Sequence, residues 1–417
     1  LSLHDALPIL WFVVGGGDGF YTAQDQTDPN TIYAESQGGA VGRLNYATGE
    51  RTQIRKPSYR ERYQQFEDSL VIARGDTTQP ETPAMKKTLA EIRSRQRADS
   101  IISDMRFNWE SPYILSAHAP QTLYMGGNRV LKSLDRGDHM FPISPDLSTQ
   151  DTAKINVSIH TTGGITLDAT GAETYGTVTT LAESPIRAGL LFAGTDDGNV
   201  WLTRNDGTTW ENLATHFTGV PKGTDVSRIE PSAFDSATFY VTFDNHERND
   251  FTPYVFVTTD FGKTFRSIAN NIPTDAPNWV RVIREDPVNR DLLFLGTDVA
   301  AYVSMDRGAN WQRFMTGLPT VPVYDLKIQP RDHELIAATH GRSIWIVDIA
   351  PLEQMKDADA RGTGTHFFAP STAFQYGESP VEGQETGQKT FQGASAPYGA
   401  QFTYRLAPGV RDSVKFT

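Results

Sequence analysis

Four carboxylates are candidates for acid–base chemistry. Glu110, Asp196, Asp244 and Asp298 stand in polar segments that border short apolar runs. Hydrolysis of a glycosidic bond needs two carboxyl groups flanking that bond, about 5–10 Å apart depending on the stereochemistry. No two of the four form a local motif, so a catalytic pair requires a fold that brings distant segments together.

A second set of side chains could bind a ligand without reacting with it. Aromatic rings stack on sugar faces, and Arg, Asn and His hydrogen-bond hydroxyl or peptide groups. The candidates are Asn108, Trp109, Asn128, Arg129, Tyr175, Arg228, His246, Trp279, Arg281, Tyr324, His340 and Arg342. Each is also a residue type that packs between elements or lies in a solvated loop, and the sequence leaves both interpretations open.

The densest polar segment spans residues 244–250 and reads Asp-Asn-His-Glu-Arg-Asn-Asp. It lacks the alternating acidic pattern of a calcium loop and the His-x-x-x-His spacing of a zinc site. We therefore predict a solvated or salt-bridged loop there. We expect no metal and no cofactor in this protein.

The candidate residues occur in an internal repeat. Each copy reads as an apolar strand, a loop, a strand of the type Leu-x-Phe-x-Gly, a third strand, and then Ser/Thr-x-Asp-x-Gly-x-x-aromatic. The last segment begins at Ser133, Thr203, Thr258 and Ser304, spacings of 70, 55 and 46 residues. Asn205 replaces the Asp of the second copy, and Met140 replaces the aromatic of the first. Such spacings are typical of propeller blades with insertions.

The repeat predicts the strands. The clearest copy gives strands at Val280–Glu285, Leu292–Gly296, Ala300–Ser304 and Trp311–Phe314. The same order fits residues 113–143, 176–213, 228–268 and 323–347, with a weaker copy over about 30–54. A four-stranded sheet cannot bury both faces alone, and radial packing of such sheets solves this. We therefore predict an all-β fold, a β-propeller of about six four-stranded blades over residues 11–350. A stacked solenoid is the alternative.

Three segments fall outside the repeat. Residues 59–104 are predicted to be a helical insertion, because residues 85–102 carry apolar positions near 3.6 spacing. Residues 351–365 are predicted to be a linker, and residues 366–417 the truncated start of a β-sandwich-like domain with strands at 401–406 and 413–416. The first ten residues do not resemble a natural N-terminus, and we expect that a signal peptide was lost with it.

Composition excludes several classes of protein. The 417 residues include no cysteine, so disulfide scaffolds, Cys-ligated metals and thiol nucleophiles are excluded. The chain has 38 Lys and Arg against 50 Asp and Glu, which argues against a nucleic-acid partner. No apolar run reaches the ~18 residues of a membrane span. A glycan or a polypeptide remains the expected partner, and the oligomeric state stays open.

The Ser/Thr-x-Asp-x-Gly segment is predicted to hold turns. Its hydroxyl and carboxylate can bond the turn backbone, glycine supplies a positive φ, and the aromatic packs between blades. The motif resembles the Asp-box, or bacterial-neuraminidase repeat, of sialidases, two-propeller xyloglucanases and sortilin-type receptors. Residues 15–350 as a whole resemble bacterial sortilin-like propeller proteins, often labelled glycosyl hydrolases. The segments that carry this resemblance are Arg106–Pro112, Val282–Pro287, Leu293–Thr297 and Thr339–Trp345.

The resemblance implies a periplasmic or secreted protein, and it leaves two functions open. In a propeller the Asp-box turn joins strands three and four, so the candidate residues are expected on the opposite face. There the protein either binds a protein, peptide or glycan, or acts as an exo-sialidase-like or endo-glucanase-like glycoside hydrolase with paired carboxylates. The cysteine-rich module that follows the propeller of sortilin has no counterpart here, because the chain lacks cysteine.

Overall fold

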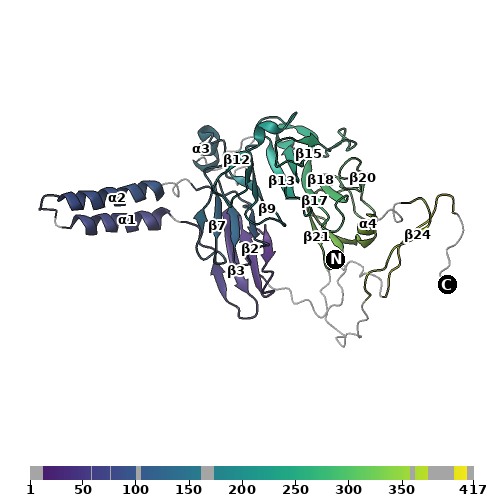
Figure 1. Cartoon of the computed structure of the whole chain (residues 1–417), viewed down its shortest axis with the longest axis horizontal. Coiled ribbons are helices and arrows are strands. Elements are labelled where there is room, and N and C mark those ends of the chain that lie inside the picture. Colours follow the sequence, from purple (N-terminus) through teal and green to yellow (C-terminus); the bar gives the residue numbers. More distant parts are fainter. Residues whose placement is uncertain are drawn as a thin grey trace. The chain divides into compact units, whose positions relative to one another are not determined.

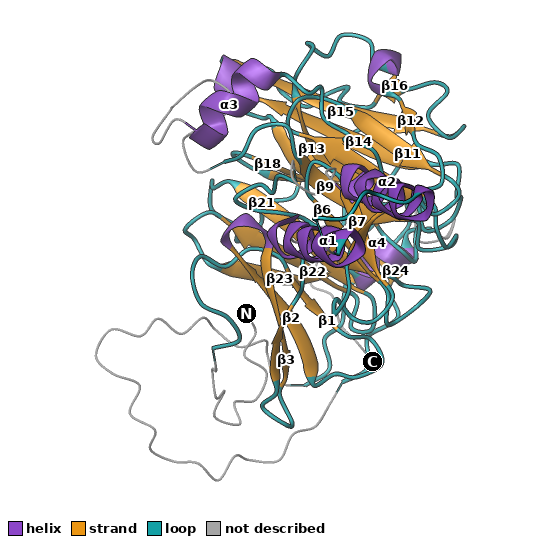
Figure 2. Cartoon of the chain, turned by 90° about the vertical axis from the view of Figure 1, so that its left-hand side faces the viewer, coloured by secondary structure: helices purple, strands orange, loops and turns teal. Residues whose placement is uncertain are grey.

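Antiparallel sheets dominate the computed structural model of the chain (Figures 1 and 2). It describes residues 13–57, 59–75, 77–99, 105–160, 173–356, 362–373 and 399–410. Contacts divide the chain into two units. The N-terminal unit comprises residues 14–183 and 187–214, and the C-terminal unit comprises residues 184–186 and the described residues from 215 onwards.

The N-terminal unit contains three four-stranded sheets in which spatial order follows sequence order. Their strands are β1 (Thr22–Gln24), β2 (Thr31–Ser36), β3 (Ala40–Asn45) and β4 (Arg51–Gln53); β5 (Tyr113–Leu115), β6 (Leu123–Gly126), β7 (Val130–Ser133) and β8 (Phe141–Pro142); and β9 (Val178–Glu183), β10 (Leu191–Thr195), β11 (Val200–Thr203) and β12 (Glu211–Asn212).

The C-terminal unit contains two further four-stranded sheets, a three-stranded sheet, and a two-stranded ribbon. Their strands are β13 (Asp225–Pro231), β14 (Phe239–Asn245), β15 (Asp250–Thr258) and β16 (Arg266–Ser267); β17 (Val280–Glu285), β18 (Leu293–Thr297), β19 (Ala301–Ser304) and β20 (Gln312–Arg313); β21 (Val323–Gln329), β22 (Glu334–Thr339) and β23 (Ile344–Asp348); and β24 (His366–Phe367) and β25 (Tyr404–Arg405). The predicted all-β propeller is confirmed, and five of its six sheets have four strands among the described residues, while the β21–β23 sheet has three.

Within the described part of the chain, four α-helices accompany the sheets. The insertion forms two helices that lie side by side, α1 (Tyr59–Arg74) and α2 (Pro83–Asp99) (Figure 2). The prediction of a helical insertion over residues 59–104 relied on the apolar spacing of residues 85–102, which overlap α2. Helix α3 (Thr152–His160) was not predicted, and the short α4 (Ala350–Gln354) begins just before the predicted linker. The strand predicted at 413–416 lies outside the described residues.

The second strand of the best-conforming repeat, β18, is fully buried, and the glycine near its end has a packing role. Every residue of β18 is buried, because both faces of the blade are covered. A Cβ on Gly296 would lie 2.7 Å from the carbonyl oxygen of Val323, which begins the next blade. Glycine at the end of Leu-x-Phe-x-Gly therefore lets the first strand of the following blade approach closely.

The Ser/Thr-x-Asp-x-Gly segments hold turns, as their spacing predicted. In all four, the first hydroxyl accepts a hydrogen bond from the glycine N–H at 2.8–3.0 Å. The Asp or Asn accepts one from the N–H four residues on at 2.8–3.0 Å. The glycine φ lies between +79° and +95°, and the residue before it is also left-handed, at +55° to +61°.

The tryptophans of this motif pack between blades. Trp210 Nε1 donates to the carbonyl of Ile143 at 2.9 Å, and Trp311 Nε1 donates to that of Ile268 at 2.7 Å. Each acceptor follows the last strand of the preceding blade. The motif thus joins neighbouring blades on one face and leaves the opposite loops available to carry a site.

Candidate functional site

A group of side chains in the loops of the C-terminal unit surrounds Arg281. Its Nε and Nη2 donate to Asp298 Oδ1 at 3.2 and 2.9 Å, and its Nη1 lies 3.9 Å from Asp244 Oδ2. The guanidinium carbon lies 4.1 Å from the ring centroid of Tyr324. His340 lies beyond it, its ring centroid 5.0 Å from that of Tyr324. Residues from three different blades therefore converge on one cation.

Local irregularities in the first strands place these side chains. The pairing of β17 with β18 shifts between Val280 and Val282, and that of β21 with β22 shifts between Val323 and Asp325. Arg281 and Tyr324 are thus the residues outside the regular ladder. A bulge redirects a side chain at the end of a strand, so both can point toward the loops.

His246 completes the group on its other side. It follows β14, and its Nδ1 lies 2.6 Å from Asp244 Oδ1. Its ring stacks on Trp279, with centroids 4.9 Å apart and planes 8° apart. The hydrogen bond to Asp244 raises the pKa of the His246 imidazole. Phe251 packs against the same indole at 5.2 Å.

Only part of this group is accessible to a ligand. Trp279 is only 7% exposed, whereas Tyr324 is 43% and Phe251 39% exposed. We call Asp244, His246, Phe251, Trp279, Arg281, Asp298, Tyr324 and His340 the Arg281 cluster.

A second network lies along the first strands of the same blades. Arg284 donates to Asp325 Oδ1 at 2.8 Å and to Glu230 Oε2 at 2.7 Å. Arg228 donates to the same Asp325 oxygen at 3.1 Å. Burial acts to raise the pKa of Asp325, but the two guanidinium groups outweigh it and hold that pKa below its usual value. Arg228, predicted to bind ligand, thus ties β13 to β21.

Four residues of these networks were not predicted as site residues: Phe251, Glu230, Arg284 and Asp325. For Glu230 and Asp325 a signal existed: Arg228 and Glu230, like Asp325 and Lys327, alternate along otherwise apolar first strands. Residues two apart lie on the same face of a strand. Nothing in the sequence singled out Phe251.

Candidates in the N-terminal unit bind the backbone. Asp196 accepts hydrogen bonds from the N–H groups of Gly176 and Thr177, the shortest at 3.0 and 2.9 Å. Asn128 Oδ1 accepts from the N–H of Arg106 at 2.9 Å. Asn108 Oδ1 accepts from the N–H of Trp109 at 2.7 Å. These contacts fix turns.

The remaining candidates show no such convergence. Tyr175 is buried beside Lys154, whose Nζ lies 5.0 Å from the ring centroid. Glu110 is exposed, and Arg129 is half-buried. Arg342 is exposed, and its carbonyl accepts a hydrogen bond from Trp345 Nε1 at 2.8 Å. Of the four candidate carboxylates, Asp244 and Asp298 share a partner, whereas Glu110 and Asp196 belong to the other unit.

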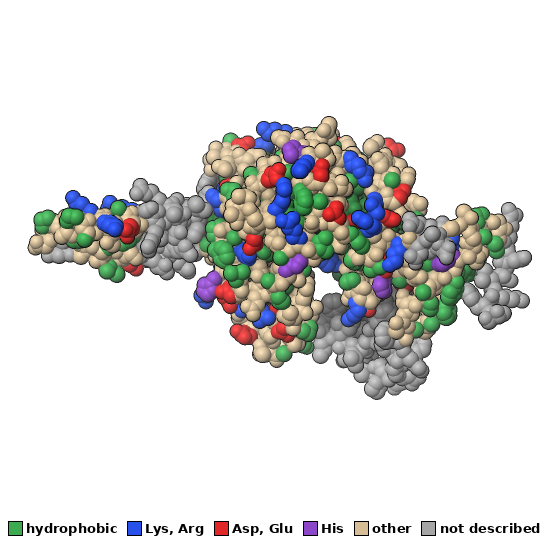
Figure 3. Space-filling model, viewed as in Figure 1, with side chains coloured by type: hydrophobic (Ala, Val, Ile, Leu, Met, Phe, Trp, Pro, Cys, Tyr) green, Lys and Arg blue, Asp and Glu red, His purple; other side chains and the backbone are tan. Residues whose placement is uncertain are grey.

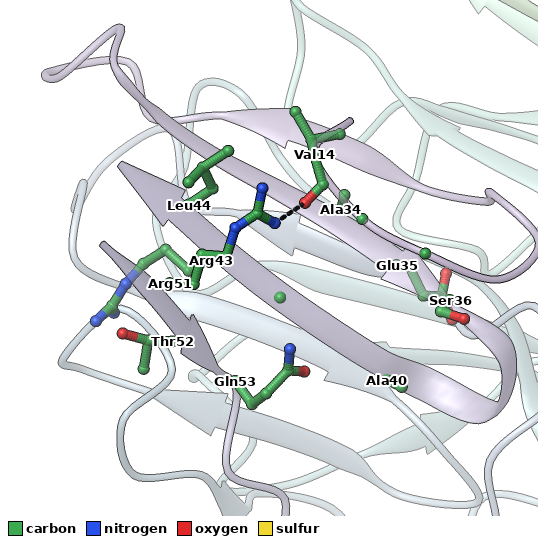
Figure 4. Close-up of a pocket in the computed structure, with 13 residues that line it drawn as sticks. Val14, Ala34, Glu35, Ser36, Ala40, Arg43, Leu44, Arg51, Thr52 and Gln53 are labelled. Carbon is green, nitrogen blue, oxygen red and sulfur yellow. Dashed lines mark hydrogen bonds between the residues drawn. The ribbon is translucent and has the colours of Figure 1, made fainter. Parts of the chain in front are cut away.

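A cavity of about 250 Å³ lies on the β1–β4 sheet of the N-terminal unit (Figure 4). No candidate residue lines it. Its two cations have partners within the unit: Arg51 donates to the Val14 carbonyl at 3.0 Å, and Arg43 to Asp138 at 3.1 Å. We do not assign the site to this cavity.

The described residues contain no group of three or more His, Cys, Asp or Glu side chains arranged for a metal ion. No helix among them is long and apolar enough to cross a membrane. On the face seen in Figure 3, basic and acidic side chains are interspersed over the sheets.

Comparison with known proteins supports the fold. No protein-family model matches the chain. It is 30% identical over 138 residues to vacuolar protein sorting/targeting protein 10 of Emericella nidulans. That alignment covers 29% of this chain and only 9% of the relative, so the chain spans less than a tenth of that protein.

Among solved structures, the chain is similar to an ancestral GH74 enzyme, with a TM-score of 0.50 and 13% identity over 79% of this chain and 36% of that one. It also matches the GH74 xyloglucanase from Xanthomonas campestris, with a TM-score of 0.48 and 15% identity over 78% and 44% of the two chains. These likenesses concern the fold. The resemblance noted in the sequence is supported at the level of the β-propeller.

Proposed function

We propose that this propeller binds a polypeptide ligand, without reacting with it, on the face of its C-terminal unit that lies opposite the Ser/Thr-x-Asp-x-Gly turns. We call this the loop face. The observation that carries this proposal is Arg281, held by Asp298 and Asp244 over the ring of Tyr324. Arg and Tyr are enriched among the residues that dominate protein interfaces. A side chain that is already oriented loses little conformational entropy on binding.

A polypeptide suits the cluster better than a glycan. Sugar rings stack on open aromatic faces, but Trp279 is almost fully buried under His246. Tyr324 carries the Arg281 guanidinium on one face. The exposed parts of Tyr324 and Phe251, together with the cation, suit apolar and carbonyl groups of a peptide.

Glycoside hydrolysis remains the alternative, and the contacts of the two carboxylates weigh against it. A glycosidase needs one carboxyl group that donates a proton to the leaving oxygen. Asp298 instead accepts two hydrogen bonds from the Arg281 guanidinium, and Asp244 is bound to His246. Both carboxylates orient cationic groups, which favours a binding role.

A location outside the cytoplasm, periplasmic or secreted, is part of the proposal. It is supported by the resemblance to sortilin-like propellers and by the similarity to a vacuolar sorting protein.

A peptide library displayed against the purified chain tests this function. We expect bound sequences, and an affinity at least tenfold weaker for Arg281→Ala. Arg307→Ala is the matched control, because Arg307 pairs with Asp291 at 2.7 Å on a Ser-x-Asp turn of the opposite face. Equal loss in both variants would overturn the proposed location. Release of sugar from a glycan panel, abolished by Asp298→Asn, would establish the hydrolase instead.

A further inference from the structure

We propose that helix α4 is a proton-dependent latch, which holds the chain after the last blade against the propeller at acidic pH and weakens that hold as pH rises through neutral. The helix packs Leu352 against a hydrophobic cluster of the β17–β20 and β21–β23 sheets, in which Ile349 is fully buried. Its Glu353 points inward and is 3% exposed. A buried carboxyl at the end of a short helix is the feature that requires an explanation.

Glu353 lies between two turns of the propeller. Its Oε2 lies 2.5 Å from Nδ1 of His333, in the turn between β21 and β22. Its other neighbour is Asp286, which directly follows β17 and is fully buried. Among the described residues these are the titratable groups that act on Glu353, one from each turn packed against α4.

The two carboxyl groups share a proton. Asp286 Oδ1 accepts hydrogen bonds from the N–H groups of Val288 and Asn289 at 2.9 and 2.6 Å. Asp286 Oδ2 and Glu353 Oε1 are buried without a hydrogen-bond partner among the described residues, and the two carboxyl groups lie close enough to shift each other's pKa. Two ionised carboxylates contain no donor, so a hydrogen bond between them requires a proton on one of them.

The energetics follow from burial. Burial raises the pKa of Glu353 to about 7, and the nearby Asp286 charge adds to that rise. Burial also raises the pKa of Asp286. Docking of α4 therefore takes up a proton. The docking is strongest when the pH is below the ordinary pKa of a carboxyl group. It weakens as pH rises through about 7, where two adjacent buried carboxylates become ionised.

Release of α4 would extend to the following segment. The next residue, Gln354, pairs with the backbone of Ala369: its Oε1 accepts from the N–H at 2.8 Å and its Nε2 donates to the carbonyl at 3.0 Å. Ala369 follows β24. The helix thus connects the last blades to the segment after them, and its docking determines whether that segment is held.

Hydrogen exchange of the full chain tests the latch. The amides of Leu352, Glu353 and Met355 bond within the α4 turn and report its docking. After correction for intrinsic rates, we expect their protection to fall about tenfold or more between pH 5.5 and 8.5, since each pH unit between the ordinary and the raised pKa can contribute up to about a factor of ten. Constant protection in the unaltered chain would overturn the proposal.

Two variants separate the proton from the packing. In Glu353→Gln the amide donates to Asp286 and its oxygen faces His333, so protection should become independent of pH. Asp286→Asn retains the acceptor for the two backbone N–H groups and should act in the same way. Asp332→Asn is the control, because Asp332 pairs with Arg331 on the exposed side of the His333 turn. If both neutral variants retain the pH dependence of the unaltered chain, the shared proton is not the latch.

Discussion

Loop aspartates at equivalent repeat positions have different partners in the two units. In the N-terminal unit the aspartate hydrogen-bonds backbone N–H groups, whereas in the C-terminal unit it hydrogen-bonds another side chain. Asp196 and Asp298 both follow a Gly-Thr pair at the end of a second strand. Asp196 bonds the N–H groups that lead into β9, and Asp298 bonds the Arg281 guanidinium on β17. One repeat position therefore serves two purposes.

The residues at the start of the first strand determine whether the aspartate binds backbone N–H groups or a guanidinium group. At Gly176, with φ of +76°, the backbone turns its N–H toward the carboxylate. At Arg281 the bulge offers a guanidinium instead. Carboxylates that bind backbone stabilise a loop, while carboxylates that bind an oriented cation can prepare a binding site.

The largest expected contrast involves two tyrosines at strand-one entries. Tyr175 is 3% exposed and Tyr324 is 43% exposed. We expect Tyr175→Ala to lower the free energy of unfolding by about 3 kcal/mol, as for other buried aromatics, and Tyr324→Ala to lower it by less than about 1 kcal/mol. Peptide affinity should fall about tenfold in Tyr324→Ala alone. Urea unfolding and a binding titration measure the two effects, and equal destabilisation would contradict the contrast.

Substitution of the two equivalent aspartates should give a smaller difference in the free energy of unfolding. Asp196→Ala removes the acceptor of two backbone N–H groups, and we expect a loss of about 2 kcal/mol in unfolding free energy. Asp298→Ala should cost about 1 kcal/mol, because its pair with Arg281 is partly solvated. Urea midpoints of the two variants decide the question. A larger loss at Asp298 would show that its role is structural.

The titration of His246 is expected to have a smaller effect on stability. The pKa of His246 is raised in the folded chain, so its contribution to stability is complete below the ordinary value of about 6.5 and is lost as pH rises through the raised one. We expect an NMR titration of His246 with a midpoint above 6.5, moving down in Asp244→Asn. A midpoint unaffected by Asp244→Asn would remove the aspartate as the cause.

The strands were predictable from the sequence because the repeat has a strong local signal. The Val280–Glu285 strand agrees to the residue, and the other strands of that blade differ at their ends by no more than one residue. The turn bonds of Ser/Thr-x-Asp-x-Gly were equally accessible, since they join residues four apart. The sequence also predicted which loops lie on the face opposite these turns.

The pairings on that face were not predictable. Arg281 meets Tyr324 only because two bulges redirect them, and no residue type marks a bulge there. Asp286 and Glu353 belong to segments that the repeat treats as a turn and a linker. Their contact depends on how α4 packs after the last blade, and local spacing carries no information about that packing.

The smallest expected effect concerns a turn that differs between the units. In the N-terminal unit Asn205 accepts from the Thr209 N–H and its amide donates to the Thr209 hydroxyl, whereas in the C-terminal unit Asp260 accepts from both the N–H and the hydroxyl of Thr264. A charged acceptor forms the stronger bond, so Asn205→Asp should stabilise the chain by about 0.5 kcal/mol at neutral pH.

The gain from Asn205→Asp should disappear in acid if its cause is the charge. At Asp260, burial acts to raise the pKa, but the hydrogen bonds from Thr264 and Thr258 outweigh it and hold the pKa at about 2. A carboxylate with a lowered pKa stabilises above its ordinary value and loses that contribution as pH falls toward the lowered one. Thermal unfolding of Asn205→Asp at pH 7 and pH 2.5 measures this, and a gain that persists in acid would assign the effect to turn geometry rather than charge.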